Sequence, residues 1–193
     1  MKYAVLFRGI NVGGKNIVKR NDLKQLLLDL ELKNVQTYIQ SGNAVLESDL
    51  DETALQNKIH DGFAKRFGFE SGVIIRNMEE IQCLIAQFPF SPDERTAAET
   101  ADPQVEHLYV YFFDSLPEQS KLDAICRKYV GSDTLRAGKR ECYLLCHQSI
   151  RKSKLAGYMS KAFTTATVRN WRSVCNLYGM MADIPMKKNK ENL

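Results

Sequence analysis

The sequence predicts an α+β fold made by tandem duplication of two ferredoxin-like βαββαβ halves with antiparallel sheets. Over residues 1–87 the patterns follow the order strand, helix, strand, strand, helix, strand, and one further helix comes after them. The same order returns over residues 105–185. The segments 75–85 and 168–178 also align without gaps, each as the end of a strand, an Arg-Asn pair and an amphipathic helix. The repeated order and this aligned junction together indicate a duplication.

The strands of the first half are predicted from short β-prone runs at residues 3–8, 34–40, 44–47 and 72–76. A first helix is expected after a cap at Asn21-Asp22, because the leucines that follow have helical spacing. A second helix opens at Asp51 and is ended by Gly68, and a third covers about 78–87.

The second half is predicted to contain strands at residues 105–113, 133–137, 141–147 and 164–169. Its helices run from Pro117 to about Tyr129, from about Ser153 to Phe163, and over about 171–180. Residues 88–104, which are polar and contain three prolines, are expected to form a flexible linker between the halves. Residues 186–193 are expected to be a disordered tail.

Composition places the chain among ordinary soluble proteins. It has 193 residues, of which 44% are hydrophobic and 26% charged, and no apolar run approaches the roughly 18 residues of a membrane span. The apolar run at the N-terminus is too short for a signal peptide. The five cysteines are odd in number and scattered through apolar segments. We therefore expect reduced thiols, a cytoplasmic location and no membrane partner.

Charge is distributed unevenly along the chain. Residues 8–24 carry five Lys/Arg and one acid, and residues 151–193 carry nine Lys/Arg and two acids. The middle, residues 25–150, carries twelve Lys/Arg and twenty acids. If the two basic stretches meet in space, they form a surface that attracts phosphate or nucleic acid. The alternative is that they are only solvated helix faces and a Lys-rich tail.

The segment Gly9–Asn16 reads G-x-x-x-x-G-K but has Asn16 where a phosphate-binding P-loop needs Ser or Thr. Four residues also separate it from the expected helix cap, and the predicted sheet is antiparallel, so a hydrolytic P-loop is not indicated. A glycine-rich turn flanked by Arg8, Lys15 and Lys19 can still bind an anion without hydrolysing it.

The predicted topology places the loop 9–16 and the turn 40–43 at the same end of the first sheet, because the strands that precede them run parallel. Polar side chains from the two segments are then expected to face each other: Gln40, Ser41 and Asn43 against Asn11, Lys15 and Asn16. The alternative is purely structural: Gly42 and Asn43 serve the turn, and Asn11 bonds the backbone of its own loop.

Other candidate motifs have structural interpretations. Cys142 and Cys146 fall on one face of a strand and His147 on the other, so we expect core thiols and no metal site. In Arg169-Asn170-Trp171, Asn170 suits a helix cap and Trp171 a packing position, which leaves Arg169 as a candidate for a site.

Four motifs, "RGINVGGKN", "TYIQSGN", "SKL" (153–155) and "RNW" (169–171), resemble a bacterial family of domains of unknown function, numbered 1697. The resemblance spans nearly the whole chain and implies a small α+β protein of two ferredoxin-like halves, with no established activity or cofactor. The residues that match the signature are Arg8, Gly9, Asn11, Gly13, Gly14, Lys15, Gln40, Ser41, Gly42 and Asn43. The family tends to read T-T-R-N-W near the end, whereas this chain inserts Ala166-Thr167-Val168.

These observations lead to a hypothesis about function. We expect a binding module for a phosphate-bearing ligand, either a nucleotide or nucleic acid; the alternatives are an enzyme acting on a phosphorylated small molecule and a protein-interaction scaffold. In the first half the expected ligand-binding residues are Arg8, Asn11, Gly13, Gly14, Lys15, Gln40, Ser41 and Asn43, and in the second half Lys154 and Arg169. Gly13 and Gly14 would let the backbone approach an anion closely. The sequence names no cofactor and fixes no oligomeric state.

Overall fold

A computed structural model describes residues 1–39 and 42–184. The first half contains a four-stranded antiparallel sheet with the order β2-β3-β1-β4. Its strands are β1 (Lys2–Arg8), β2 (Lys33–Tyr38), β3 (Asn43–Glu47) and β4 (Gly72–Asn77). Its helices are α1 (Arg20–Asp29), α2 (Glu52–Phe67) and α3 (Met78–Ala86). The chain therefore follows the predicted βαββαβ order and ends the half with the predicted extra helix.

The second half repeats this arrangement with the strand order β6-β7-β5-β8, again antiparallel throughout. Its strands are β5 (Leu108–Phe112), β6 (Thr134–Ala137), β7 (Glu141–Leu145) and β8 (Thr167–Asn170). Its helices are α5 (Gln119–Lys128), α6 (Lys154–Ala162) and α7 (Trp171–Asp183). The predicted α+β class and the duplication into two similar halves are confirmed.

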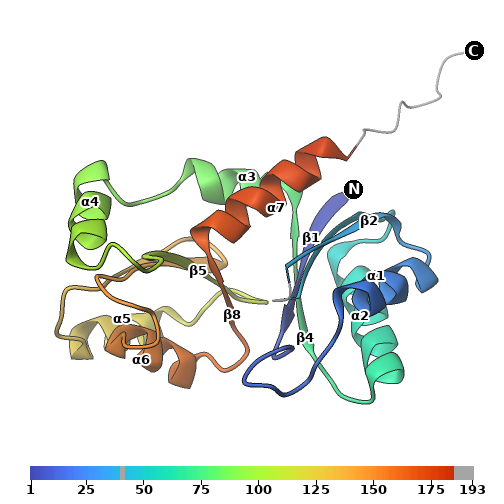
Figure 1. Ribbon diagram of the computed structural model, residues 1–193, viewed down its shortest axis with the longest axis horizontal. Helices are drawn as coiled ribbons and strands as arrows, with labels where there is room; N and C mark the ends of the chain where they lie inside the picture. The colour runs from blue at the N-terminus through green and yellow to red at the C-terminus, as the bar shows by residue number, and fades with distance from the viewer. Residues whose placement is uncertain (40–41, 185–193) are drawn as a thin grey trace, which may run out of the picture.

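Both sheets are covered on both faces, which explains why the central strands are apolar without interruption. In β1, Val5 and Phe7 face an outer core under α1 and α2, while Ala4 and Leu6 face a core shared by the two halves. A third core lies under α5 and α6. Figure 1 shows α7 crossing both halves on the same side as α3, and α7 packs against β1 and β3 of the first half. The halves are thus joined through a common apolar core.

The prediction of a flexible linker at residues 88–104 is wrong, because this segment contains α4 (Pro92–Ala101). The Ser91 hydroxyl accepts a hydrogen bond from the Glu94 amide at 3.2 Å, and the Glu94 carboxylate accepts one from the Ser91 amide at 2.8 Å. Pro92 occupies the first turn, where its missing N–H is not needed. Arg136 on β6 also binds Glu94 at 2.6 Å. A capping box therefore starts a helix in a segment whose three prolines had suggested a linker.

The two strand-to-helix junctions, β4 to α3 and β8 to α7, have the same structure, as the aligned Arg-Asn pairs predict. The side chain of Asn77 accepts from the Glu80 amide and that of Asn170 from the Ser173 amide, each at 2.9 Å, so both asparagines cap the helix that follows them. The predicted cap of α1 is wrong: the helix begins at Arg20 with no side-chain cap. The predicted tail, residues 186–193, lies outside the described residues. Among those that are described, no helix is long and apolar enough to cross a membrane.

Candidate functional site

The strand registers show which positions of the two halves correspond. In the first sheet Tyr3 on β1 pairs with Asn77 on β4, and in the second Tyr109 on β5 pairs with Asn170 on β8. Because Asn77 and Asn170 are aligned helix caps, Tyr3 and Tyr109 occupy equivalent positions. The remaining positions of these strands follow by counting along the chain.

Counting from these anchors makes Arg8 equivalent to Asp114, and Gly72 equivalent to Thr165. All four positions line one cleft of about 330 Å³ between the halves. The duplicated position at the end of the central strand therefore carries a cation in one half and an anion in the other. The first half adds Gln56, Asn57, His60 and Gly72–Ile74 to the lining, and the second half contributes Asp114 and Thr165.

Arg8 is held at the end of β1 with most of its donors unused. Its Nη1 donates to the Thr164 carbonyl at 2.6 Å, and this is the only hydrogen bond that the guanidinium makes to a described residue. The Nε atom is buried and has no acceptor in the described part of the chain. Gly72 pairs with Arg8 across the sheet, and a Cβ at position 72 would lie 2.9 Å from Nε. Glycine at this position therefore leaves space for the guanidinium.

A carboxylate also lines the cleft and is held by a side-chain hydrogen bond. Gln56 on α2 donates from Nε2 to the Val73 carbonyl and to Asp114 Oδ1, both at 2.7 Å. These two bonds use both amide protons of Gln56, so its Oε1 remains as an acceptor. Arg8 and Asp114 thus face the same cleft with opposite charges, and each is held by a different partner.

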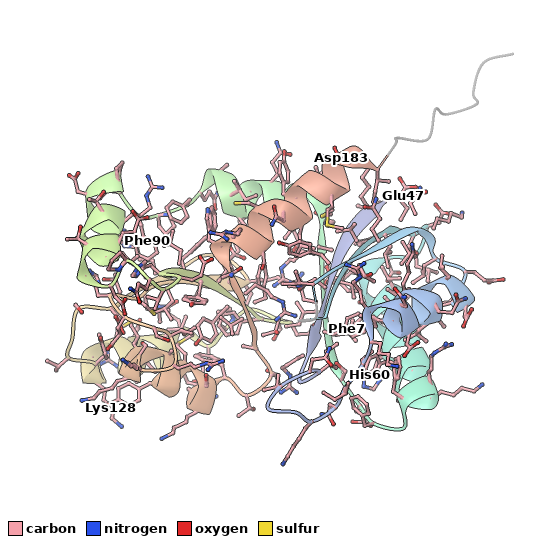
Figure 2. The ribbon with its side chains drawn as sticks, in the orientation of Figure 1. Phe7, Glu47, His60, Phe90, Lys128 and Asp183 are labelled. Carbon is pink, nitrogen blue, oxygen red and sulfur yellow. The ribbon has the colours of Figure 1, made fainter. Side chains whose placement is uncertain are left out.

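A titratable side chain lies on the same wall as Gln56. His60 is one turn further along α2, and its Nδ1 lies 3.4 Å from Asp61 Oδ1. In Figure 2 the label of His60 lies below that of Phe7, near the lower ends of the central strands. An imidazole at this position can hold or transfer a proton beside a ligand in the cleft.

The predicted glycine-rich loop is a small hairpin that follows Arg8. The Asn11 amide donates to the Asn16 carbonyl and the Lys15 amide to the Val12 carbonyl, each at 3.0 Å. Gly13 and Gly14 have φ of 58° and 75°, the positive values that a type I′ turn requires at its two central residues. The glycines therefore form the turn itself, and the exposed Lys15 lies at its tip.

The side-chain amides of Asn11 and Asn16, two residues predicted to face the turn 40–43, make hydrogen bonds to the backbone at the base of this hairpin. Asn11 Nδ2 donates to the Val18 carbonyl at 3.0 Å, and Asn11 Oδ1 accepts from the Val18 amide at 2.9 Å. Asn16 Nδ2 donates to the Gly9 carbonyl at 3.0 Å. These contacts match the structural alternative for Asn11, and they fix the hairpin relative to Arg8.

Arg169 and Asn43 are brought together, but in the interior. Arg169 Nε donates to Asn43 Oδ1 at 2.5 Å, and its Nη2 donates to the Phe7 carbonyl at 2.7 Å. Asn43 is fully buried and Arg169 is 7% exposed. Burial lowers the pKa of the Arg169 guanidinium to about 10, and the group stays charged at neutral pH. Both residues are buried and do not line the cleft.

The remaining residues that the sequence singled out are not seen to line the cleft. Gln40 and Ser41 lie outside the described residues. Lys154 is exposed in the first turn of α6 and does not line the cleft. The segment after α6 contains Thr164, whose carbonyl binds Arg8, and Thr165, which lines the cleft. Cys142 and Cys146 are buried in the core under α6, and burial raises the pKa of each thiol to about 12.

Sequence reasoning missed Gln56, Asn57, His60, Gly72, Asp114 and Thr165 as residues of a site. Asp114 comes three residues before Pro117, where the sequence predicts the start of a helix, and an acid near a helix start has a structural explanation. A signal for it was present, because extending the alignment of the halves from their Arg-Asn junctions back to β1 and β5 pairs Asp114 with Arg8.

Comparison with known proteins identifies the family and the fold. A family described as a protein of unknown function (DUF1697) matches residues 1–143, so the chain belongs to this family. The chain is similar to a solved structure, a conserved bacterial protein from Streptococcus pneumoniae, with a TM-score of 0.74 and 24% identity over 94% of this chain and 98% of that one. This likeness supports the fold alone. No curated protein matches the chain.

Proposed function

We propose that this DUF1697 protein binds a phosphate-bearing ligand in the cleft between its two halves. The observation that carries the proposal is the guanidinium of Arg8, which lines the cleft and donates a single hydrogen bond to the described residues. Nη2 donates to no described residue, and a charge-assisted hydrogen bond from this group to an anion would contribute about 1.5–3 kcal/mol. Phosphate oxygens would accept from the N–H groups of Nη2 and from the second N–H of Nη1, a contact that arginine favours.

The hairpin adds positive charge next to this group. It begins at the residue after Arg8, its glycine turn presents Lys15 to solvent, and Lys19 and Arg20 follow at its base, both exposed. Figure 1 shows it at the lower end of the molecule, beside the segment that leads into β8. In this proposal Arg8 makes the direct contact with phosphate, and Lys15 raises the local concentration of anions.

The dimensions of the cleft favour a small ligand over a nucleic acid. A volume of about 330 Å³ lies at the lower end of the range of small-molecule sites. A nucleic-acid surface would need several phosphate contacts, and its affinity would fall steeply with salt as counterions are released. The affinity of a small ligand that binds in the cleft through one arginine should depend on salt far less.

Isothermal titration calorimetry with inorganic phosphate, nucleoside monophosphates and a short oligonucleotide at two salt concentrations tests the proposal. Arg8→Met should abolish or weaken phosphate binding by about tenfold or more, because a charge-assisted contact is lost. Arg172→Met is the matched control, since this arginine side chain is 76% exposed and lies outside the cleft. Equal phosphate affinity in the wild type and Arg8→Met would contradict the proposal, and no binding of any probe would favour an interaction scaffold.

A second candidate function is an enzyme acting on a phosphorylated small molecule, and His60 is the observation that favours it. General acid–base catalysis needs a group that exchanges a proton near neutral pH within reach of the ligand. His60 lines the cleft with Arg8. Turnover of a bound phosphate ester, lost in His60→Gln while binding persists, would establish this activity.

A further inference from the structure

We infer that Asp114, held in place by Gln56, recognises the hydroxyl groups of the ligand, so that the ligand is a phosphorylated sugar or a nucleotide with free vicinal hydroxyls. This inference rests on the proposed function, because it concerns the same cleft. It follows from the hydrogen-bond donors and acceptors of the residues that line the cleft.

Asp114 and Gln56 present free acceptor atoms in the cleft. An ionised carboxylate has no donor, and Asp114 Oδ1 already accepts from Gln56 Nε2 at 2.7 Å. The second proton on Gln56 Nε2 is used by the Val73 carbonyl. Asp114 Oδ2 and Gln56 Oε1 therefore remain, and both need a donor. A phosphate group would be repelled here, whereas a hydroxyl would be bound.

Arg8, elsewhere on the lining, offers only donors, and its Nη groups make a single hydrogen bond to the described residues. A ligand that satisfies both Arg8 and Asp114 carries an anionic group and hydrogen-bond donors. A sugar phosphate has this arrangement, and carboxylates commonly bind the hydroxyls of ribose in nucleotide sites. Vicinal hydroxyls supply two donors, one for each of the free acceptor oxygens of the hydrogen-bonded Asp114 and Gln56 side chains.

The neighbouring side chains favour a neutral group over an ammonium. Asn57 and Thr165 are the remaining polar residues on the lining beside Asp114, apart from His60, and both are uncharged. Amides and hydroxyls both donate and accept, as sugar hydroxyls do. The positive charge of Arg8 in the same small cleft also disfavours a second cation.

The inference is tested by calorimetry on the full chain with four probes: inorganic phosphate, ribose 5-phosphate, 2-deoxyribose 5-phosphate and 2-aminoethyl phosphate. We expect ribose 5-phosphate to bind about tenfold or more tightly than phosphate, the advantage of a hydrogen bond to a charged group. Asp114→Asn should remove most of this advantage while leaving the affinity for phosphate within about twofold. Asp93→Asn, at an exposed acid in the first turn of α4, is the matched control and should change neither affinity.

The outcomes separate this inference from the proposed function. If ribose 5-phosphate and phosphate bind equally and both depend on Arg8, the phosphate site stands and the role of Asp114 fails. If 2-deoxyribose 5-phosphate binds as tightly as ribose 5-phosphate, vicinal hydroxyls are not recognised. Tighter binding of 2-aminoethyl phosphate would show that Asp114 binds a cation and would overturn the assignment to a sugar. If no probe binds, the proposed function fails, and this inference fails with it.

Discussion

Arg76 and Arg169 make reciprocal contacts across the boundary between the halves. Arg76 on β4 donates from Nη2 to the Phe113 carbonyl at the end of the second half's central strand, at 2.5 Å. Arg169 on β8 donates from Nη2 to the Phe7 carbonyl at the corresponding place in the first half, at 2.7 Å. Each half thus supplies a buried arginine that binds the other half's backbone, and the duplication is preserved in its interface.

The two contacts differ most clearly at Nε. Arg169 Nε donates to Asn43, whereas Arg76 Nε is buried without an acceptor among the described residues. The position equivalent to Asn43 is Glu141, whose carboxylate instead accepts from the backbone amides of Lys139 and Arg140 at 3.1 Å. The pKa of Arg76 is lowered, first by burial and then by the charge of Arg140. The Arg169 contact is therefore the more complete of the two.

Replacing Arg169 with Met should destabilise the protein by at least about 3 kcal/mol. Its guanidinium also donates to the Thr167 hydroxyl and to the Gly42 carbonyl, so the substitution leaves several buried acceptors without donors. Urea denaturation measures the effect. Arg172→Met, at an exposed position, should change the free energy of unfolding by less than about 0.5 kcal/mol. Similar stability of the two variants would show that the buried contact does not hold the halves together.

Gly72→Ala should reduce phosphate binding more than stability. The new Cβ would lie 2.9 Å from Arg8 Nε, so the guanidinium must move from its place in the cleft. Gly157→Ala is the matched control: this helical glycine has open space around it, and alanine should stabilise α6 by about 0.5–1 kcal/mol. Calorimetry with phosphate and thermal melting of both variants give the result. Unchanged phosphate affinity in Gly72→Ala would show that the position of the Arg8 guanidinium does not matter for phosphate binding.

Two turn glycines should respond differently to alanine. Gly42 has φ of +73°, and a Cβ there would lie 2.5 Å from Ile10 Cδ1, so Gly42→Ala combines backbone strain with a steric clash. Gly14 has φ of +75° but open space, so Gly14→Ala suffers strain alone, about 1 kcal/mol. Urea denaturation should therefore rank Gly42→Ala as clearly less stable. The reverse order would mean that the hairpin tip matters more to the fold than the packing of Gly42.

Lys15→Ala should leave the melting temperature nearly unchanged, because an exposed lysine typically changes folding by less than about 0.5 kcal/mol. Phosphate affinity should fall, and the loss should shrink at high salt. Lys24→Ala, at an exposed lysine on α1, is the charge-matched control. Leu26→Ala should do the opposite and cost about 2–5 kcal/mol of stability, since Leu26 is 3% exposed. A Lys15→Ala variant that unfolds easily but binds phosphate normally would make the hairpin purely structural.

Stability should fall at alkaline pH because of two buried thiols. Burial raises the pKa of Cys142 and Cys146 to about 12, whereas the unfolded chain ionises near pH 8.5. The stabilisation is complete below the unfolded pKa and is lost as pH rises toward the folded value, by up to about 1.4 kcal/mol per pH unit for each thiol. Urea denaturation between pH 8 and 11 checks this. A Cys142→Ala variant should show a shallower decline, and an unchanged slope would rule out this cause.

Local pattern was enough to predict most of the fold. The apolar, β-prone run of β1 and the caps at Asn77 and Asn170 depend on nearest neighbours, and they appear in the structure where the sequence places them. The helix α4 was missed although its signal is local, because Ser91 and Glu94 form a capping box only if their side chains are considered together with Pro92. The family resemblance was also readable, since its motifs are contiguous.

The location of the candidate site was decided by tertiary structure. Arg8, Asn43 and Arg169 were all predicted to bind the ligand, yet only Arg8 lines the cleft, while the other two are buried. Nothing in the sequence pattern distinguishes a buried arginine that binds several carbonyl groups, such as Arg169, from one that lines a cleft and binds a single carbonyl, such as Arg8. That distinction depends on which backbone groups the second half brings within reach. Arg8 and Asp114 line one cleft because the duplicated halves pack through a shared core, to which both central strands contribute side chains.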